Sequence, residues 1–253
     1  MHSIFIIAKK EFMDNFRNNW IIALSAILAI LALLASYFSS RDLEWQDFEF
    51  TIRIIIMPVQ FLIPIIGLIL GYATVVGEIE KGSMGSLLSH PVTRNEVILG
   101  KFLGLGSVIF TTIFIGFGIA GIIIAINISN PDVGLYLLFI IASILLGLAF
   151  MSLALLFSSF FKKRSSAMAG VIMLWIFFNM LWGFLMFGLL ISTSGGSLST
   201  PDWFYQVQLV NPTVAYSYIN TSFIENHWII LSLLAWSILP SLLAFLIFKR
   251  RDV

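Results

Sequence analysis

The 253-residue sequence contains no cysteine, and charged residues make up only 11% of it. The absence of cysteine excludes disulfides and thiolate metal sites. Soluble domains carry about 25% charged residues, so charge this sparse would not cover the surface of a soluble globule of this size. Together with 59% hydrophobic residues, it indicates a polytopic membrane protein. A net charge of +1 argues against nucleic acid as a partner.

Several chemistry-bearing patterns are also missing. There is no HExxH, no GxSxG and no pair of carboxylates suited to catalysis, which disfavours a membrane-embedded enzyme. No acidic, basic or histidine residue falls near the middle of an expected span, and no internal repeat marks an inverted-repeat carrier. Ion-coupled carriers and voltage sensors need such buried charges, so a secondary transporter is disfavoured. No metal site is predicted.

The hydrophobic residues are arranged in runs of membrane-spanning length. A bilayer core about 30 Å thick needs roughly 20 helical residues. Six runs are long enough, so we predict a single all-α transmembrane domain over residues 1–253. The predicted spans are 20–38, 52–76, 97–126, 133–161, 166–191 and 227–248.

Residues 3–18 predict an amphipathic helix that lies in the membrane interface ahead of the first span. Its apolar stripe includes Phe12, and a polar N-terminal tail is the alternative reading. The stretch is not a signal peptide, because its lysines follow the short apolar run rather than precede it. The charged residues expected to face headgroups or water are Lys9, Lys10, Glu11 and Arg17.

The basic residues predict the orientation. Of the 14 Lys and Arg residues, all except Arg41 and Arg53 fall on one side of the predicted spans. Basic residues favour the cytoplasmic side. We therefore expect a multi-pass protein of the cell membrane with both termini in the cytoplasm, which agrees with an even number of spans.

A polar segment between spans two and three, residues 77–101, has helical character of its own. Residues 83–88 predict a short amphipathic helix, which Pro91 ends because proline disfavours helical geometry in the residue before it. Held by a span at each end, such a helix would act as a lever that moves both spans. A solvated loop is the alternative. The residues expected to contact a partner here are Glu78, Glu80, Lys81, Gly82, Ser83, Leu87, Leu88, His90, Pro91 and Arg94.

This segment resembles the corresponding connection in the permease subunits of type-2 ABC exporters. The shared pattern comprises acidic residues, a Gly-Ser pair, a Leu-rich helix, a Pro-x-Thr-Arg and a Gly-Lys entering the next span. It is matched by Glu78, Glu80, Gly82-Ser83, Leu87-Leu88, Pro91-Val92-Thr93-Arg94 and Gly100-Lys101.

The resemblance extends over essentially the whole chain. It includes Ala8-Lys9-Lys10-Glu11-Phe12 before span one and Asn211-Pro212 before span six. The length and the N-terminal start are also similar to the permease of the copper-related maturation system for nitrous oxide reductase. Gly85 departs from the pattern, because a glycine inside a helix costs about 1 kcal/mol relative to alanine.

The resemblance implies two permeases paired with two cytoplasmic ATPases. The helix around Ser83–His90 would rest in a groove of the ATPase, and ATP-driven closure would tilt the spans. The chain contains no GxxxxGK[ST] loop, the loop that cradles nucleotide phosphates. We therefore expect ATP and Mg²⁺ on the partner ATPase and no cofactor on this chain. A membrane scaffold or channel-like protein without ATP coupling is the alternative.

Two further regions raise hypotheses. In span five, Asn179, Met173 and Met180 are candidates for lining a cleft between two copies of the chain. Thioethers can bind Cu(I), but packing and lipid contact also explain methionines that have no histidine or cysteine beside them. The aromatic residues of the outer loop 192–226 indicate short re-entrant helices at the outer surface, or a docking site for an extracytoplasmic accessory protein.

Overall fold

The computed structural model describes residues 2–38, 44–89, 91–194, 200–219, 221 and 223–250. These residues form helices and turns with no strand among them, so the all-α prediction is confirmed. Six helical stretches are long and apolar enough to cross a membrane, which confirms the predicted number of spans. They are Trp20–Phe38, Phe48–Glu80, Arg94–Asn127, Val133–Phe160, Arg164–Thr193 and Asn226–Arg250.

Short helices and one π-helical turn lie between and within these spans. The elements in chain order are α1 (His2–Arg17), α2 (Trp20–Phe38), α3 (Phe48–Gly71), α4 (Val76–Glu80), α5 (Ser83–Leu88), α6 (Arg94–Asn127), α7 (Val133–Phe160), α8 (Arg164–Ile176), η1 (Phe177–Leu181), α9 (Trp182–Ser194), α10 (Asp202–Gln208), α11 (Pro212–Ser217) and α12 (Asn226–Arg250).

Side-chain caps set where several helices begin. Asp47 accepts a hydrogen bond from the Phe50 N–H at 2.7 Å, so α3 begins at Phe48 rather than at the predicted residue 52. Thr93 and Glu96 form a reciprocal capping box at the start of α6, a strong N-terminal signal. The backbone N–H of Thr93 donates to Glu96 and lowers the pKa of that carboxyl group.

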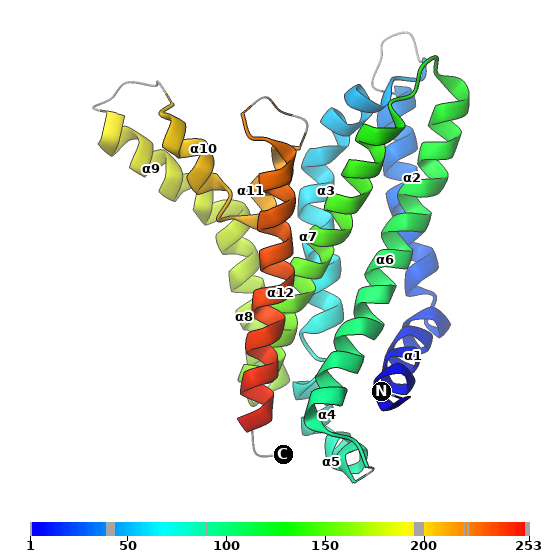
Figure 1. Cartoon of the computed structure of the whole chain (residues 1–253), viewed down its shortest axis with the longest axis vertical. Helices are drawn as coiled ribbons and strands as arrows, with labels where there is room; N and C mark the ends of the chain where they lie inside the picture. Colours follow the sequence, from blue (N-terminus) through cyan, green and yellow to red (C-terminus); the bar gives the residue numbers. More distant parts are fainter. Residues whose placement is uncertain are drawn as a thin grey trace.

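Helix α7 lies at the centre of the bundle and packs against α3 on one side and α12 on another (Figure 1). The helices meet closely at small residues, as expected of membrane bundles. A Cβ on Gly67 would lie 2.6 Å from the Gly147 carbonyl. Ser152 Oγ donates to the Ser237 carbonyl at 2.6 Å.

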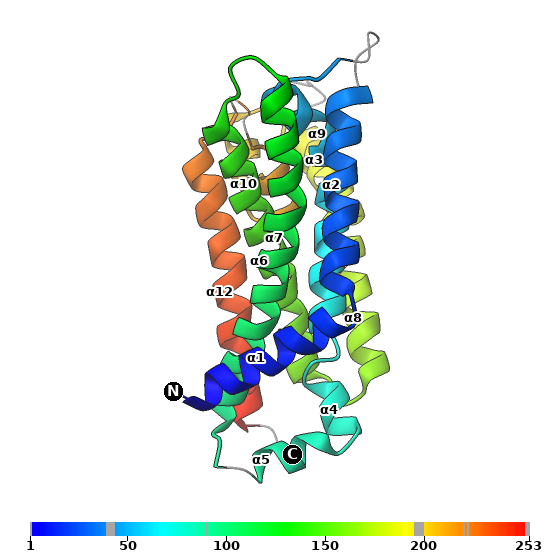
Figure 2. The same cartoon turned by 90° about the vertical axis from the view of Figure 1, so that its right-hand side faces the viewer.

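Helices α1, α4 and α5 lie together at one end of the bundle, where α12 also ends (Figures 1 and 2). Helix α1 crosses the lower part of α6, and α4 and α5 project beyond the spans. With 34 residues, α6 is about 51 Å long at 1.5 Å per residue, which is longer than a bilayer core needs. Its N-terminal part therefore reaches this group of short helices.

Span five is helical over Arg164–Thr193, close to the predicted residues 166–191, but it is not regular along its length. The π-helical turn η1 divides it, and α9 then leans away from the bundle (Figure 1). Only 17% of its central apolar stretch is buried, against 67% for α7. Span five is thus the least covered of the six.

The described residues of the loop 192–226 form two short helices, α10 and α11, and α11 packs into the bundle, as a re-entrant helix does. Its Tyr216 is fully buried and exchanges a 2.8 Å hydrogen bond with Ser143 of α7. The Tyr216 hydroxyl thus has a partner inside the bundle, and burial of a polar group is tolerated when it is hydrogen-bonded, so the segment can fold inward.

Candidate coupling site

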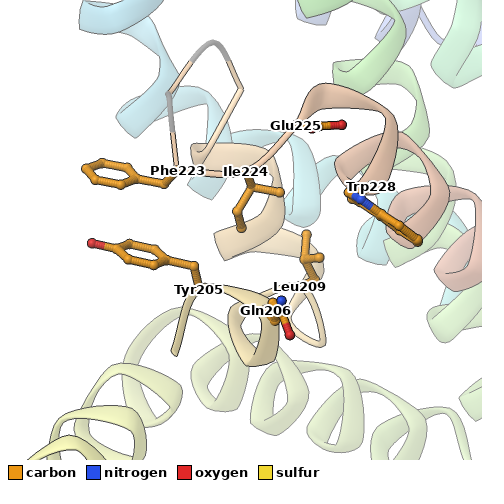
Figure 3. Close-up of a pocket in the computed structure, with 7 residues that line it drawn as sticks. All are labelled: Tyr205, Gln206, Leu209, Phe223, Ile224, Glu225 and Trp228. Atoms are coloured by element: carbon orange, nitrogen blue, oxygen red, sulfur yellow. The ribbon is translucent and has the colours of Figure 1, made fainter. Parts of the chain in front are cut away.

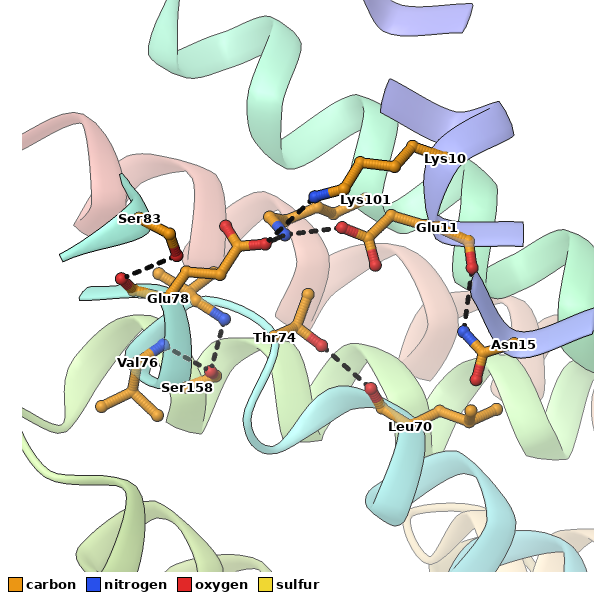
Figure 4. Close-up of polar contacts among 11 residues, drawn as sticks. Lys10, Glu11, Asn15, Leu70, Thr74, Val76, Glu78, Ser83, Lys101 and Ser158 are labelled. Carbon is orange, nitrogen blue, oxygen red and sulfur yellow. Dashed lines mark hydrogen bonds and ion pairs between the residues drawn. The ribbon is translucent and has the colours of Figure 1, made fainter. Parts of the chain in front are cut away.

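Lys101 lies at the centre of a charged cluster where α1, α4 and α6 meet (Figure 4). Its side chain is 1% exposed, and Nζ donates to Glu11 Oε1 of α1 and to Glu78 Oε1 of α4, both at 2.7 Å. Lys10 Nζ lies 3.9 Å from the same Glu78 oxygen. One buried ammonium group therefore ties α1 and α4 to α6.

Small residues on α6 bring α1 close enough for these bonds. A Cβ on Gly104 would lie 2.6 Å from the Ala8 carbonyl and 2.7 Å from Glu11 Cβ. Ile7, one turn before Glu11, is buried on the same side of α1. Glu11 therefore faces inward, which corrects the prediction that it lies on the water-facing side of the helix.

The break between α3 and α4 is held by Ser158 of α7. Its buried Oγ accepts hydrogen bonds from the Val75 N–H at 2.9 Å and the Val76 N–H at 3.1 Å. The first N–H groups of a helix have no partner within that helix, so Ser158 serves as a cap supplied by a distant span. This cap gives α4 a fixed starting point on the bundle.

Glu80, at the other end of α4, caps span five. Its Oε1 accepts a 2.8 Å hydrogen bond from the Arg164 N–H at the start of α8. A carboxylate near a helix N-terminus is stabilised by the helix dipole. Arg164 in turn donates to the Tyr72 hydroxyl at 2.7 Å. Glu80 therefore has a hydrogen-bond partner within this chain, but its side chain remains exposed, and its contact with a partner protein stays a prediction.

Helix α5 forms over Ser83–Leu88, as the sequence predicted. Gly82 has a φ of 72°, a conformation that favours glycine, and it turns the chain from α4 into α5. Lys81, Gly82 and Ser83 are exposed, whereas Met84 is fully buried and anchors the helix to the bundle. The side chains of Leu87 and Leu88, and the whole of His90, lie outside the described residues.

The other residues predicted to contact a partner or the membrane interface also lie at this end of the molecule. Arg94 Nη1 donates to the Phe248 carbonyl at 3.2 Å near the end of α12. Pro91 is exposed just before α6. On α1, Phe12 is half-buried, and the exposed basic residues are Lys9, Lys10 and Arg17.

The residues predicted to line a cleft lie on the poorly covered span five. Met173 and Met180 are 72% and 56% exposed, so neither packs in the core of this chain. Asn179 Nδ2 donates to the Trp175 carbonyl of its own helix at 3.0 Å. Among the described residues, no group of three His, Asp or Glu side chains could hold a metal ion.

A pocket of about 550 Å³ opens at the opposite end of the bundle, beside α10 and the start of α12 (Figure 3). The Tyr205 and Phe223 rings stack there with centroids 4.7 Å apart. Its lining consists of Tyr205, Gln206, Leu209, Phe223, Ile224, Glu225 and Trp228.

Neither Lys101 nor Ser158 was among the predicted site residues. A lysine about one turn into the predicted span 97–126, placed between Gly100 and Gly104, was a usable signal for Lys101, because small residues predict close helix packing around it. No sequence signal marks Ser158, since serine is common in membrane helices.

Comparison with known proteins agrees with this architecture. The model of the ABC-2 family transporter protein matches residues 5–253. The chain is 32% identical over 278 aligned positions to the "Probable ABC transporter permease protein NosY" of Stutzerimonas stutzeri, covering 99% of each chain. It is 34% identical to the protein of the same name from Pseudomonas aeruginosa, covering 88% of this chain and 82% of the relative. The chain belongs to the ABC-2 transporter family and is a transmembrane permease subunit of an ABC transporter.

Proposed function

We propose that this permease converts ATP hydrolysis by a separate cytoplasmic ATPase subunit into movement of its spans, for substrate export or for force on an extracytoplasmic partner. The observation that carries the proposal is the cluster around Lys101, which joins α4 to α1 and α6 through two 2.7 Å ion pairs. ATP and Mg²⁺ would bind to the ATPase, and this chain would hold no cofactor.

The proposed stroke begins at α5, which rests on the ATPase through its exposed N-terminal residues. Displacement of α5 moves α4, because only Lys81 and Gly82 separate the two helices. Lys101 carries that displacement to span three, and Glu80 carries it to span five. Two spans and the interfacial helix are then displaced together.

A second copy of the chain would cover span five. Its low burial leaves a long apolar face, on which Met173 and Phe184 are 72% and 76% exposed. In the homodimer, Asn179, Met173 and Met180 would line a cleft between the copies, and lipid would surround the remaining spans.

The pocket beside α10 could bind an extracytoplasmic protein, and this supports the proposal that such a partner receives the force. The relatives named NosY support the narrower resemblance to the permease of the copper-related maturation system for nitrous oxide reductase. In the orientation that we propose, α1, α5 and both termini lie in the cytoplasm, and the pocket beside α10 lies on the opposite side of the membrane.

Orientation can be measured with single cysteines, because the chain has none of its own. Ser83→Cys on α5 and Gln206→Cys on α10 place the reporter at exposed positions at opposite ends. A membrane-impermeant maleimide added to intact cells should label only Gln206→Cys, and Ser83→Cys should react after permeabilisation. The reverse pattern would overturn the orientation.

ATPase docking is tested by co-purification of the co-expressed subunits in mild detergent. Because Glu80 caps span five, the docking variant is Lys81→Glu with Leu87→Asp, which leaves that cap intact. ATPase activity should co-purify with the wild type and be lost with this variant. Arg53→Glu reverses an exposed charge at the opposite end and should retain the activity. If no ATPase accompanies well-folded wild type, the proposed coupling is wrong.

A further inference from the structure

The π-helical turn in span five leaves one backbone carbonyl without its usual donor. The Trp182 N–H bonds to the Phe177 carbonyl, five residues back. In a regular α-helix it would bond to the Phe178 carbonyl, four residues back. Phe178 O therefore needs another donor, because an unpaired carbonyl is costly where no water is present.

Asn211 supplies that donor from the outer segment. Its side chain is fully buried, and Nδ2 donates to Phe178 O at 2.7 Å. Its Oδ1 accepts hydrogen bonds from the Thr213 N–H at 2.9 Å and the Val214 N–H at 3.3 Å. One amide thus joins the π turn of span five to the first turn of α11.

The residues just before Asn211 are bound to another span. Ser232 Oγ and Trp236 Nε1 of α12 donate to the carbonyls of Leu209 and Val210, at 2.5 and 3.0 Å. The segment therefore has α12 on one side and span five on the other. A second tie to span five runs from Trp182 Nε1 to Gln208 Oε1 at 2.7 Å.

We infer that Asn211 is the positioning residue through which movement of span five reaches the outer segment, residues 200–226. The inference rests on the proposed function, in which Glu80 moves the cytoplasmic end of α8. π turns interrupt helices and often occur at functional sites, and α9 beyond the turn packs little against the bundle. The Asn211 amide, which donates to the carbonyl that the π turn leaves without its helical donor, is therefore the contact that carries a tilt of span five to α11.

Two substitutions separate this tie from the cap of α11. Asn211→Ser keeps a good N-cap residue but is too short to reach Phe178 O. Asn211→Asp keeps the shape and the cap and replaces the donor amide with an acceptor, which gives a second variant if the first does not fold. The matched control is Tyr136→Phe, which removes an equally buried hydrogen bond to a backbone carbonyl, Phe117 O at 2.9 Å, without touching span five.

The experiment uses the permease–ATPase complex in nanodiscs with one environment-sensitive fluorophore per permease. Met168→Cys reports the cytoplasmic part of span five, and Gln206→Cys reports the outer segment; both positions are exposed. Fluorescence is compared between the nucleotide-free state and the state trapped with ATP and vanadate. In the wild type, both reporters should change their emission on trapping.

In Asn211→Ser and Asn211→Asp, the change at the outer reporter should fall at least twofold, while ATPase activity and the change at Met168→Cys persist. Tyr136→Phe should leave all three readouts as in the wild type. A wild-type fluorescence change at Gln206→Cys in either Asn211 variant would overturn the inference and leave the proposed function standing. An equal loss of that change in Tyr136→Phe would do the same. Absence of any response at Met168→Cys in the wild type would overturn the proposed function first, and the inference with it.

Discussion

Neutralising Lys101 is the sharpest test of the coupling cluster. Lys101→Met keeps a long side chain but removes the ammonium group that sits 2.7 Å from both Glu11 Oε1 and Glu78 Oε1. The variant leaves two carboxylates facing each other in a largely buried site. Removing one partner of a buried ion pair is far more destabilising than replacing the whole set with apolar groups.

The distances give the size of the effect. The two carboxylate oxygens are at most twice 2.7 Å, or 5.4 Å, apart. At an effective dielectric of about 20, their repulsion is about 3 kcal/mol, and breaking a buried pair typically costs 3–5 kcal/mol. For a chain of this length, each kcal/mol lowers Tm by roughly 2–4 °C. Lys101→Met should therefore lower Tm by about 6–20 °C.

Thermal unfolding in detergent, followed by the fluorescence of the seven tryptophans, measures this change. The triple variant Glu11→Gln, Glu78→Gln, Lys101→Met removes all the charges together and should recover most of the lost stability. Lys81→Met is the matched control, because Lys81 is an exposed lysine that directly follows α4, the helix that carries Glu78. It should change stability by no more than about 0.5 kcal/mol.

A Tm of Lys101→Met within about 2 °C of the wild type would refute the electrostatic argument. So would a triple variant as unstable as the single one, because the damage would then come from packing rather than from uncompensated carboxylates. A stable triple variant that no longer responds to the ATPase would separate the two roles of the cluster, stability and transmission.

Further outcomes follow from other contacts. Gly104→Leu should detach α1 and make Glu11→Cys reactive to maleimide, whereas Gly118→Leu should not, because a Cβ at Gly118 meets no atom within 4 Å. Glu80→Ala should cost about 1 kcal/mol, as for a lost N-cap, and should reduce ATP-driven movement of span five; unchanged movement would count against that link. The pKa of Glu96 is lowered in the folded chain, so its contribution to stability is present above the pKa of the unfolded state and is lost as pH falls through the folded pKa. The Tm difference between wild type and Glu96→Gln should accordingly shrink on acidification, and a difference independent of pH would contradict this.

The sequence by itself determined the local features of this protein. Runs of about 20 apolar residues predict spans because a bilayer accepts only a helix whose backbone is internally bonded. The helix α5 follows from its short amphipathic pattern and the proline after it. The family could be named from the pattern of residues 77–101. All of these signals are carried by neighbouring residues in the chain.

Only the tertiary structure decided what the polar residues do. Lys101 meets Glu11 across 90 positions, Glu80 meets the Arg164 N–H across 84, and Asn211 meets Phe178 across 33. No periodicity in the sequence reports such pairs, because they depend on which helices pack together and at what depth. The physical reason is the scarcity of water in the bundle: most buried polar groups are paired with other groups of the protein, and the fold decides which partner is within reach.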